Sequence, residues 1–154
     1  MSICWIAVIF YFSSQSYYEQ TIIPQLQSWL PAKELRERVP DLVISYDHVY
    51  VNAKKNPYGF IEFIFRKLSH LFVYAVLGCF FMLLFRFRIA KNWLSILFTL
   101  VLCMVVAGLD EVNQLDAVKR TPSIVDVGID AAGAMIGVMV ALLVQRIYAR
   151  NKRE

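Results

Sequence analysis

Charged residues are scarce in this sequence: Asp, Glu, Lys and Arg make up 18% of its 154 residues, against about 25% in an average soluble domain. Three cysteines without ligand-like spacing, five prolines and six glycines exclude a disulfide scaffold, a cysteine metal site and a collagen-like repeat. The abundance of apolar side chains excludes intrinsic disorder. The net charge of +4 is too small to indicate binding to nucleic acid, and no basic face carries interleaved aromatic residues.

Apolar side chains, by contrast, are abundant: 58% of the residues are hydrophobic and 14% are aromatic. A soluble domain of this length leaves much of its surface in water and cannot bury so many large apolar groups. The lipid bilayer is therefore the expected environment and the first partner of the chain. Lys and Arg are then read as signals of topology.

Four apolar segments predict an all-α membrane protein, a four-transmembrane-helix bundle within a single domain, 1–154. We expect transmembrane helices over about residues 1–15, 63–85, 93–109 and 124–147, an outer loop over 16–62 and a tail over 148–154. The first segment lacks the basic start and the cleavage site of a signal peptide. It is therefore read as a spanning helix that begins abruptly, as if the chain started late.

Basic residues between the apolar segments predict the orientation. Arg86, Arg88 and Lys91 separate the second and third segments without any acidic residue, and four more bases, Arg146, Arg150, Lys152 and Arg153, lie at the end of the fourth segment and after it. Such short basic stretches stay in the cytoplasm, so we expect both termini inside and residues 16–62 outside. In this outer loop, Ile22–Leu30 has the spacing of an interfacial helix, and Val43–Val51 has the composition of a small hairpin.

The unexpected polar residues fall at one level of this topology, the outer ends of the helices. The candidate site residues are Ser14, Gln15, Lys67, His70, Tyr74, Asp110, Glu111, Gln114, Arg120, Asp126 and Asp130. Their spacing makes stripes on helices, since Asp110 and Gln114, like Asp126 and Asp130, are four residues apart. A charge facing lipid at the bilayer centre costs ~3 kcal/mol or more, so we expect the stripes to face one another in a shared, partly hydrated cavity.

Four short motifs contain these residues: FSSQ at Phe12–Gln15, RKLSH at Arg66–His70 with Tyr74, DEVNQ at Asp110–Gln114, and RTPSIVDVGIDAAG at Arg120–Gly133. They resemble the motifs of the VanZ-like family of small bacterial membrane proteins. The resemblance covers both ends of the chain, and the motifs occur in the family's order. It implies a multi-pass protein of the bacterial cytoplasmic membrane with a link to tolerance of the lipoglycopeptide teicoplanin. It implies no settled biochemical activity.

One hypothesis is an enzyme whose site faces outward and acts on an amphiphilic or lipid-linked substrate of the cell envelope. His70 with Asp110 or Glu111 would be the acid and base, with Asp130 as a further catalytic candidate. Asp126 and Asp130 could hold a divalent cation or a water, and Lys67 or Arg120 could bind phosphate. No nucleophile elbow, phosphate loop or zinc motif defines the reaction.

Three other interpretations stay open. The site could recognise a lipid head group or an antibiotic without turnover, with Ser14, Gln15, Tyr74 and Gln114 as binding residues. The cluster could instead be a structural network in which Arg66, Lys67 and Arg120 neutralise the acids. Ion-coupled transport is the weakest interpretation, because no polar residues line the cytoplasmic half and only a homo-oligomer would add a path.

Overall fold

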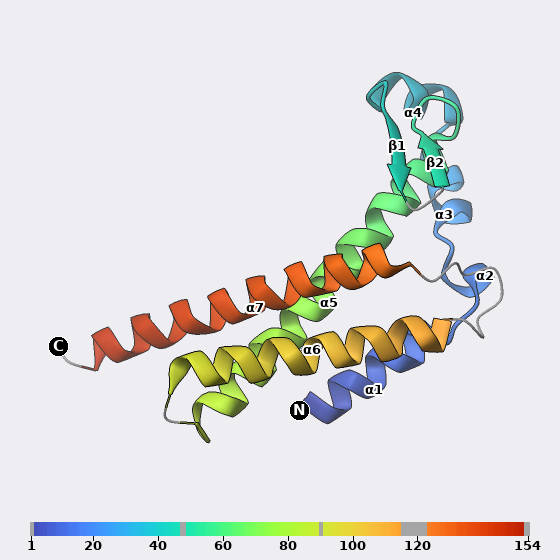
Figure 1. Cartoon of the computed structure of the whole chain (residues 1–154). Coiled ribbons are helices and arrows are strands. Elements are labelled where there is room, and N and C mark those ends of the chain that lie inside the picture. The colour runs from blue at the N-terminus through green and yellow to red at the C-terminus, as the bar shows by residue number, and fades with distance from the viewer. Residues whose placement is uncertain (1, 47–48, 90, 115–122, 153–154) are drawn as a thin grey trace.

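The computed structural model of the chain describes residues 2–46, 49–89, 91–114 and 123–152. Arg120 and His48 lie outside these described residues. Most of the described chain is helical (Figure 1). The elements in chain order are α1 (Ser2–Ser13), α2 (Tyr17–Gln20), α3 (Ile23–Trp29), α4 (Ala32–Arg38), β1 (Val43–Tyr46), β2 (Val49–Asn52), α5 (Pro57–Arg86), α6 (Asn92–Gln114) and α7 (Ile124–Asn151).

Three of the helices, α5, α6 and α7, are long and apolar enough to cross a membrane. They are longer than the apolar runs that predict them, with 30, 23 and 28 residues. Helix α5 begins at Pro57 because proline suits the first turn and the Asn56 side chain accepts a hydrogen bond from the Gly59 amide at 3.0 Å. Helix α1 is apolar but has 12 residues, fewer than the ~20 of a typical span.

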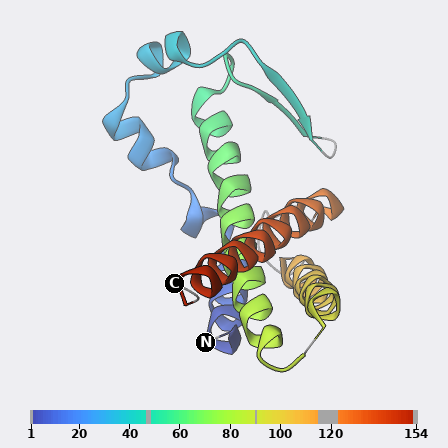
Figure 2. The same ribbon diagram turned by 90° about the vertical axis from the view of Figure 1, so that its left-hand side faces the viewer.

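Helices α5 and α7 cross in close contact (Figures 1 and 2). A Cβ atom on Gly137 would lie 2.0 Å from the Ala75 carbonyl oxygen, and one on Gly133 would lie 2.4 Å from that of Leu71. The contact is reciprocal, because a Cβ on Gly78 would lie 2.5 Å from the Ala134 carbonyl oxygen. Small residues thus let the two backbones touch and fix how the helices align.

Helix α1 packs against α5 and α6. The Trp5 indole Nε1 donates to the Val73 carbonyl on α5 at 3.0 Å, and the Ser13 hydroxyl donates to the Asp110 carbonyl on α6 at 3.3 Å. Buried Ile9 belongs to the main apolar core together with residues of the three long helices. That core continues below the polar residues as a cluster around Met82, Val138 and Ala141.

The short elements between α1 and α5 gather at one end of the bundle, and the two termini lie at the other (Figure 1). Strands β1 and β2 form an antiparallel hairpin in which Ile44 is opposite Val51 and Tyr46 is opposite Val49. A second small core joins this region to α5 through Leu35, Val39, Ala53 and Phe60. The hairpin is therefore attached to the first turns of α5, next to the polar end of the bundle.

Candidate functional site

Polar side chains from α5, α6 and α7 are buried at the hairpin end of the bundle. Seven of the described buried polar residues lie there: Glu62, Asp110, Glu111, Gln114, Ser123, Asp126 and Asp130. Asp130 is completely inaccessible to solvent although it lies inside an apolar helix. A buried polar group is costly unless a partner satisfies it, so these side chains need partners from neighbouring elements.

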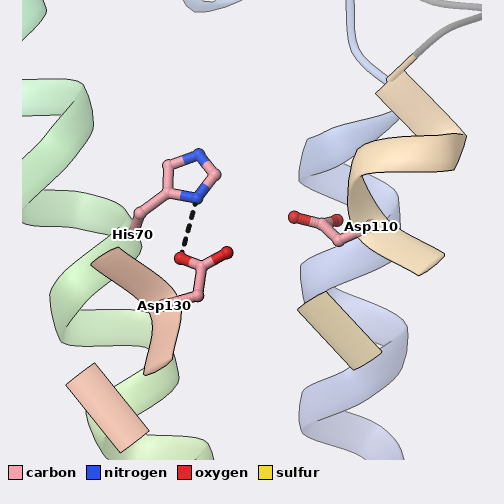
Figure 3. Close-up of side chains that lie close together, drawn as sticks. All are labelled: His70, Asp110 and Asp130. Atoms are coloured by element: carbon pink, nitrogen blue, oxygen red, sulfur yellow. Dashed lines mark hydrogen bonds and ion pairs between the residues drawn. The ribbon is translucent and has the colours of Figure 1, made fainter. Parts of the chain in front are cut away.

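The centre of the cluster is formed by His70, Asp110 and Asp130, one from each long helix. His70 Nδ1 lies 3.1 Å from Asp130 Oδ1, and one ligand atom from each of the three residues lies within 4.8 Å of the others. Figure 3 shows the Asp110 carboxylate directed from α6 toward the His70–Asp130 pair. An imidazole and two carboxylates in this arrangement can exchange protons or coordinate a cation.

Several buried oxygen atoms of this cluster have no hydrogen-bond partner among the described residues. They are the Tyr74 hydroxyl, Glu111 Oε1 and Asp130 Oδ2. Tyr74 is 1% exposed and lies one turn after His70 on α5. An unsatisfied buried polar atom costs ~1–3 kcal/mol, so the cluster has capacity for a ligand that would supply these bonds.

A second set of contacts surrounds Asp126, one turn before Asp130. Its Oδ1 atom accepts from the Lys67 ammonium group on α5 and from the Tyr46 hydroxyl on β1. The Lys67 ammonium also lies 4.2 Å from the centre of the Tyr46 ring and 5.3 Å from that of Phe63. Burial, followed by the hydrogen bond to Asp126, raises the pKa of Tyr46 well above its ordinary value, so this hydroxyl remains a donor at neutral pH.

Neighbouring polar groups hold the acids of α6 in place. The Ser123 amide donates to Glu111 Oε2 at 2.8 Å, where it joins the start of α7 to α6. Gln114 Nε2 donates to Asp110 Oδ2 at 3.4 Å. The Gln114 contact holds the Asp110 carboxylate on the side of α6 that faces His70 (Figure 3).

A cavity of about 470 Å³ opens onto the cluster between α1, α5 and α6. Its polar base includes His70, Asp110 and Gln114. Apolar and aromatic side chains form much of the remaining wall: Trp5, Val8, Ile9, Phe12, Phe65, Val73 and Tyr74. Gln15, Glu19, Gln20, Arg66 and Ser69 add polar groups. The cavity therefore combines an apolar wall with a polar end.

A smaller cavity of about 200 Å³ lies beside the hairpin. It is lined by the Tyr46, Lys67 and Asp126 contacts and by Glu62, whose carboxylate accepts from the Tyr17 hydroxyl at 2.7 Å and from the Ile22 amide at 3.2 Å. Arg66 lines both cavities. The wall between them thus carries a permanent positive charge.

The structure divides the residues predicted from the sequence into groups. His70, Tyr74, Asp110 and Gln114 come together at the base of the larger cavity, and Gln15 lies in its wall. Asp130 does not line this cavity but is buried against His70. Lys67 and Asp126 form a separate ion pair. Asp126 and Asp130, expected together as cation ligands, thus contact different partners on α5, Lys67 and His70.

Two predicted residues lie apart from this site. The exposed Ser14 hydroxyl donates to the Tyr11 carbonyl of its own helix at 2.9 Å. Glu111 contacts the start of α7 rather than the cavity. Arg120 is among the residues that the structure does not describe.

Sequence reasoning missed three residues, Arg66, Glu62 and Tyr46. The sequence predicts only a neutralising role for Arg66. A position adjacent to Lys67 on a helix projects about 100° away from it, and this direction takes Arg66 to the larger cavity. Glu62 is four residues before Arg66, a helical spacing that could have marked it. No sequence pattern indicates a role for Tyr46, because its contact with Asp126 joins residues 80 positions apart.

Comparison with known proteins identifies the family. The family model VanZ/LLP1 matches residues 1–145 of the 154-residue chain. The chain belongs to the VanZ/LLP1 family. This confirms the resemblance drawn from the motifs, and the three apolar helices agree with a VanZ/LLP1 membrane protein. Neither the search of curated proteins nor that of solved structures gave a match.

Proposed function

We propose that this VanZ/LLP1 protein binds an amphiphile of the outer leaflet in the larger cavity and acts on its head group with the polar cluster. The observation that carries the proposal is the build of this cavity, which has an apolar wall on α1 and α5 and a polar base at His70 and Asp110. Ligand sites are typically concave and apolar with a few convergent polar groups. An amphiphile matches both parts.

The apolar part of the ligand would lie between α1 and α5. Val8, Phe12 and Phe65 line the cavity and are also 40%, 54% and 54% exposed on the outside of the bundle. In a bilayer these surfaces face acyl chains, so a lipid chain can lie along the wall without leaving the hydrocarbon region. These exposed apolar side chains at the cavity favour a lipid-linked ligand over a purely water-soluble one.

The polar part of the ligand would meet Arg66 and the cluster. A guanidinium group at the wall suits an anionic head group such as a phosphate, which it can bind through two parallel hydrogen bonds. His70 lies beside the carboxylates of Asp110 and Asp130 and is the group suited to transfer a proton near neutral pH. We assign acid and base roles to His70 and these carboxylates.

The proposed topology has four membrane crossings, with α1 as the first and both termini in the cytoplasm. Arg86 and Arg88 lie at the end of α5 opposite the cluster, and Arg146 and Arg150 end α7 on that same side. The cluster and the hairpin then face outward. Exposed Trp29 on α3 is a residue type that prefers the interface between membrane and water.

Two observations bear on the other functions. The Lys67–Asp126 ion pair supports a structural role for that part of the cluster. Binding of the amphiphile without turnover is the second candidate function. The apolar cluster around Met82, Val138 and Ala141 closes the opposite half of the described bundle. This arrangement disfavours ion-coupled transport through one chain.

Cavity-filling variants test the binding proposal. Val8→Trp places a large side chain in the cavity, and Ile3→Trp is the matched control because Ile3 lies on the same helix, is 81% exposed and does not line the cavity. Each protein is reconstituted in nanodiscs made from a bacterial polar lipid extract, and the lipids retained after delipidation are quantified by mass spectrometry. We expect at least a tenfold loss of retained lipid for Val8→Trp. Equal retention by both variants would contradict the proposal.

His70→Gln tests the reaction and the link to antibiotic tolerance. We expect the variant to retain lipid as the wild type does, while mass spectrometry no longer detects a modified head group. Cells that express the wild-type protein should tolerate more teicoplanin than cells that express His70→Gln at the same level. Unchanged head groups with the wild-type protein would leave binding without turnover as the function.

A further inference from the structure

We propose that His70, Asp110 and Asp130 bind one divalent transition-metal cation, of the class of Mn²⁺ or Zn²⁺, beside the larger cavity, which His70 and Asp110 line. The inference deepens the proposed function. It rests on that function in one respect only, namely that the larger cavity is a ligand site. It replaces the pair Asp126 and Asp130 as the expected ligands, because Asp126 is held by Lys67 and Tyr46.

The geometry of the three residues is close to that of a coordination site. Each comes from a different long helix, and one ligand atom from each lies within 4.8 Å of the other two. Ligands at 2.0–2.2 Å from one ion lie about 3–4 Å from one another. His70 Nδ1 and Asp130 Oδ1 are already 3.1 Å apart, so a small rotation of Asp110 completes the set.

Two oxygen atoms independently indicate that something is bound here. Asp130 Oδ2 is buried and has no hydrogen-bond partner among the described residues, on a side chain that is 0% exposed. The Tyr74 hydroxyl, also buried and without such a partner, lines the same cavity as His70 and Asp110. A cation would satisfy the carboxylate oxygen, and a water on that cation could accept from the tyrosine hydroxyl.

The charges around the site favour a cation. Lys67, three residues before His70 on α5, is engaged by Asp126, and Arg66 lies in the wall of the larger cavity. Asp110 and Asp130 bring two carboxylates close together, and a divalent ion offsets such a concentration of like charge. A mixed set of imidazole and carboxylate ligands suits Mn²⁺ or Zn²⁺ better than Mg²⁺ or Ca²⁺, which prefer oxygen ligands throughout.

A bound cation would change the role of His70 in the proposed function. The imidazole becomes a ligand, and proton transfer passes to a water whose acidity the cation increases. Gln114, which donates to Asp110 Oδ2 at 3.4 Å, would orient that ligand from outside the coordination sphere. The polar end of the cavity would then present a positive centre to the head group.

Metal titration of the full chain tests the inference. Protein in nanodiscs is stripped with EDTA and titrated with Mn²⁺, followed by electron paramagnetic resonance, and separately with Zn²⁺, followed by elemental analysis after desalting. We expect one ion per chain and a loss of affinity of about 100-fold or more for Asp130→Asn and His70→Ala. Glu34→Gln is the control, because it removes an exposed acid on α4, outside the cluster, and should leave the affinity unchanged.

A thermal shift keeps the test valid if a variant is unstable. The cation should raise the Tm of the wild-type protein and of Glu34→Gln but not that of Asp130→Asn. Failure of the wild-type protein to bind either ion, or equal binding by Asp130→Asn, would overturn the inference. Lipid retention in EDTA separates the two proposals. If the protein retains lipid but binds no ion, the proposed function stands and the cation site is wrong. If the protein binds the ion but Val8→Trp does not change lipid retention, the cation site stands and the proposed lipid binding is wrong.

Discussion

The Tyr46 hydroxyl on the hairpin donates a hydrogen bond to the Asp126 carboxylate on α7, 80 residues away in the sequence. This bond ties the outer hairpin to the helix that carries Asp130. The Tyr46 ring also covers the Lys67 ammonium group, which binds the same carboxylate oxygen. The position of the hairpin over the smaller cavity therefore depends on a contact with the polar residues of the bundle.

Tyr46→Phe should release the hairpin while the bundle keeps its fold. The substitution removes one hydrogen bond to a charged group, worth about 1.5–3 kcal/mol, but keeps the ring over Lys67. Hydrogen exchange of the amides in 43–52 should become faster, and exchange in α5 to α7 should stay the same. Tyr50→Phe, on the exposed part of the same hairpin, is the control and should change neither.

Lys67→Met should destabilise the protein because it leaves Asp126 without its cation. Removal of one partner of a buried ion pair costs ~3–5 kcal/mol, and the 20% exposure of the Lys67 side chain reduces the loss toward the lower value. The measurement is a double-mutant cycle of thermal or denaturant unfolding with Lys67→Met, Asp126→Asn and the pair. The double variant should lose less stability than the sum of the single variants. Additive losses would show that the two side chains do not interact.

Gly137→Ala should separate α5 from α7. The new Cβ would lie 2.0 Å from the Ala75 carbonyl oxygen and 2.7 Å from the Cys79 amide nitrogen, and both are backbone atoms that cannot turn aside. We expect a loss of about 1–3 kcal/mol, the range for overpacked cores. Gly128→Ala, on the same helix with nothing within 4 Å, should instead gain about 0.5–1 kcal/mol from helix propensity. Equal Tm values for the two variants would refute the close contact.

Acid should loosen the start of α2, beside the larger cavity. The Glu19 carboxylate accepts from the Ser16 amide at 2.7 Å and from the Ser16 hydroxyl at 2.9 Å. These bonds, the one to the amide first, hold the pKa of Glu19 below its ordinary value of 4.5. A lowered pKa stabilises the folded form above the unfolded value, and the contribution disappears as the pH falls through the folded value. The protection factor of the Ser16 amide, which corrects for the intrinsic pH dependence of exchange, should therefore fall below about pH 4.5 in the wild-type protein, and Glu19→Gln should remove this dependence.

The sequence predicts the long helices well, because uninterrupted apolar runs have few alternatives. It places their ends less well. Helix α5 starts at Pro57 rather than near Phe63, because the cap of Asn56 and the proline start the helix before the apolar run begins. Helix α6 continues past the apolar run to Gln114, because Asp110 and Gln114 are satisfied inside the bundle. Hydropathy measures only the affinity for lipid, so it cannot detect a helix that buries polar groups against its neighbours.

The candidate site could be predicted as a set of residues but not as a set of pairs. Helical spacing puts Asp126 and Asp130 on one face of α7, and both Lys67 and His70 are on α5, so either acid could have met either base. The contacts of Gly133 with Leu71 and of Gly137 with Ala75 fix the alignment of the two helices. Those contacts bring Lys67 to Asp126 and His70 to Asp130, and no property of the single helices encodes them. The roles of these residues stay predictions.

Arg66 lines both cavities, and this shared position couples them electrically. An anion that neutralises its guanidinium from one side lowers the positive potential available on the other. Two anionic ligands would therefore compete for the protein even when each fits its own space and the two never touch. Inhibition of the proposed function need not involve the larger cavity, because a small anion bound in the smaller cavity beside the hairpin would be enough.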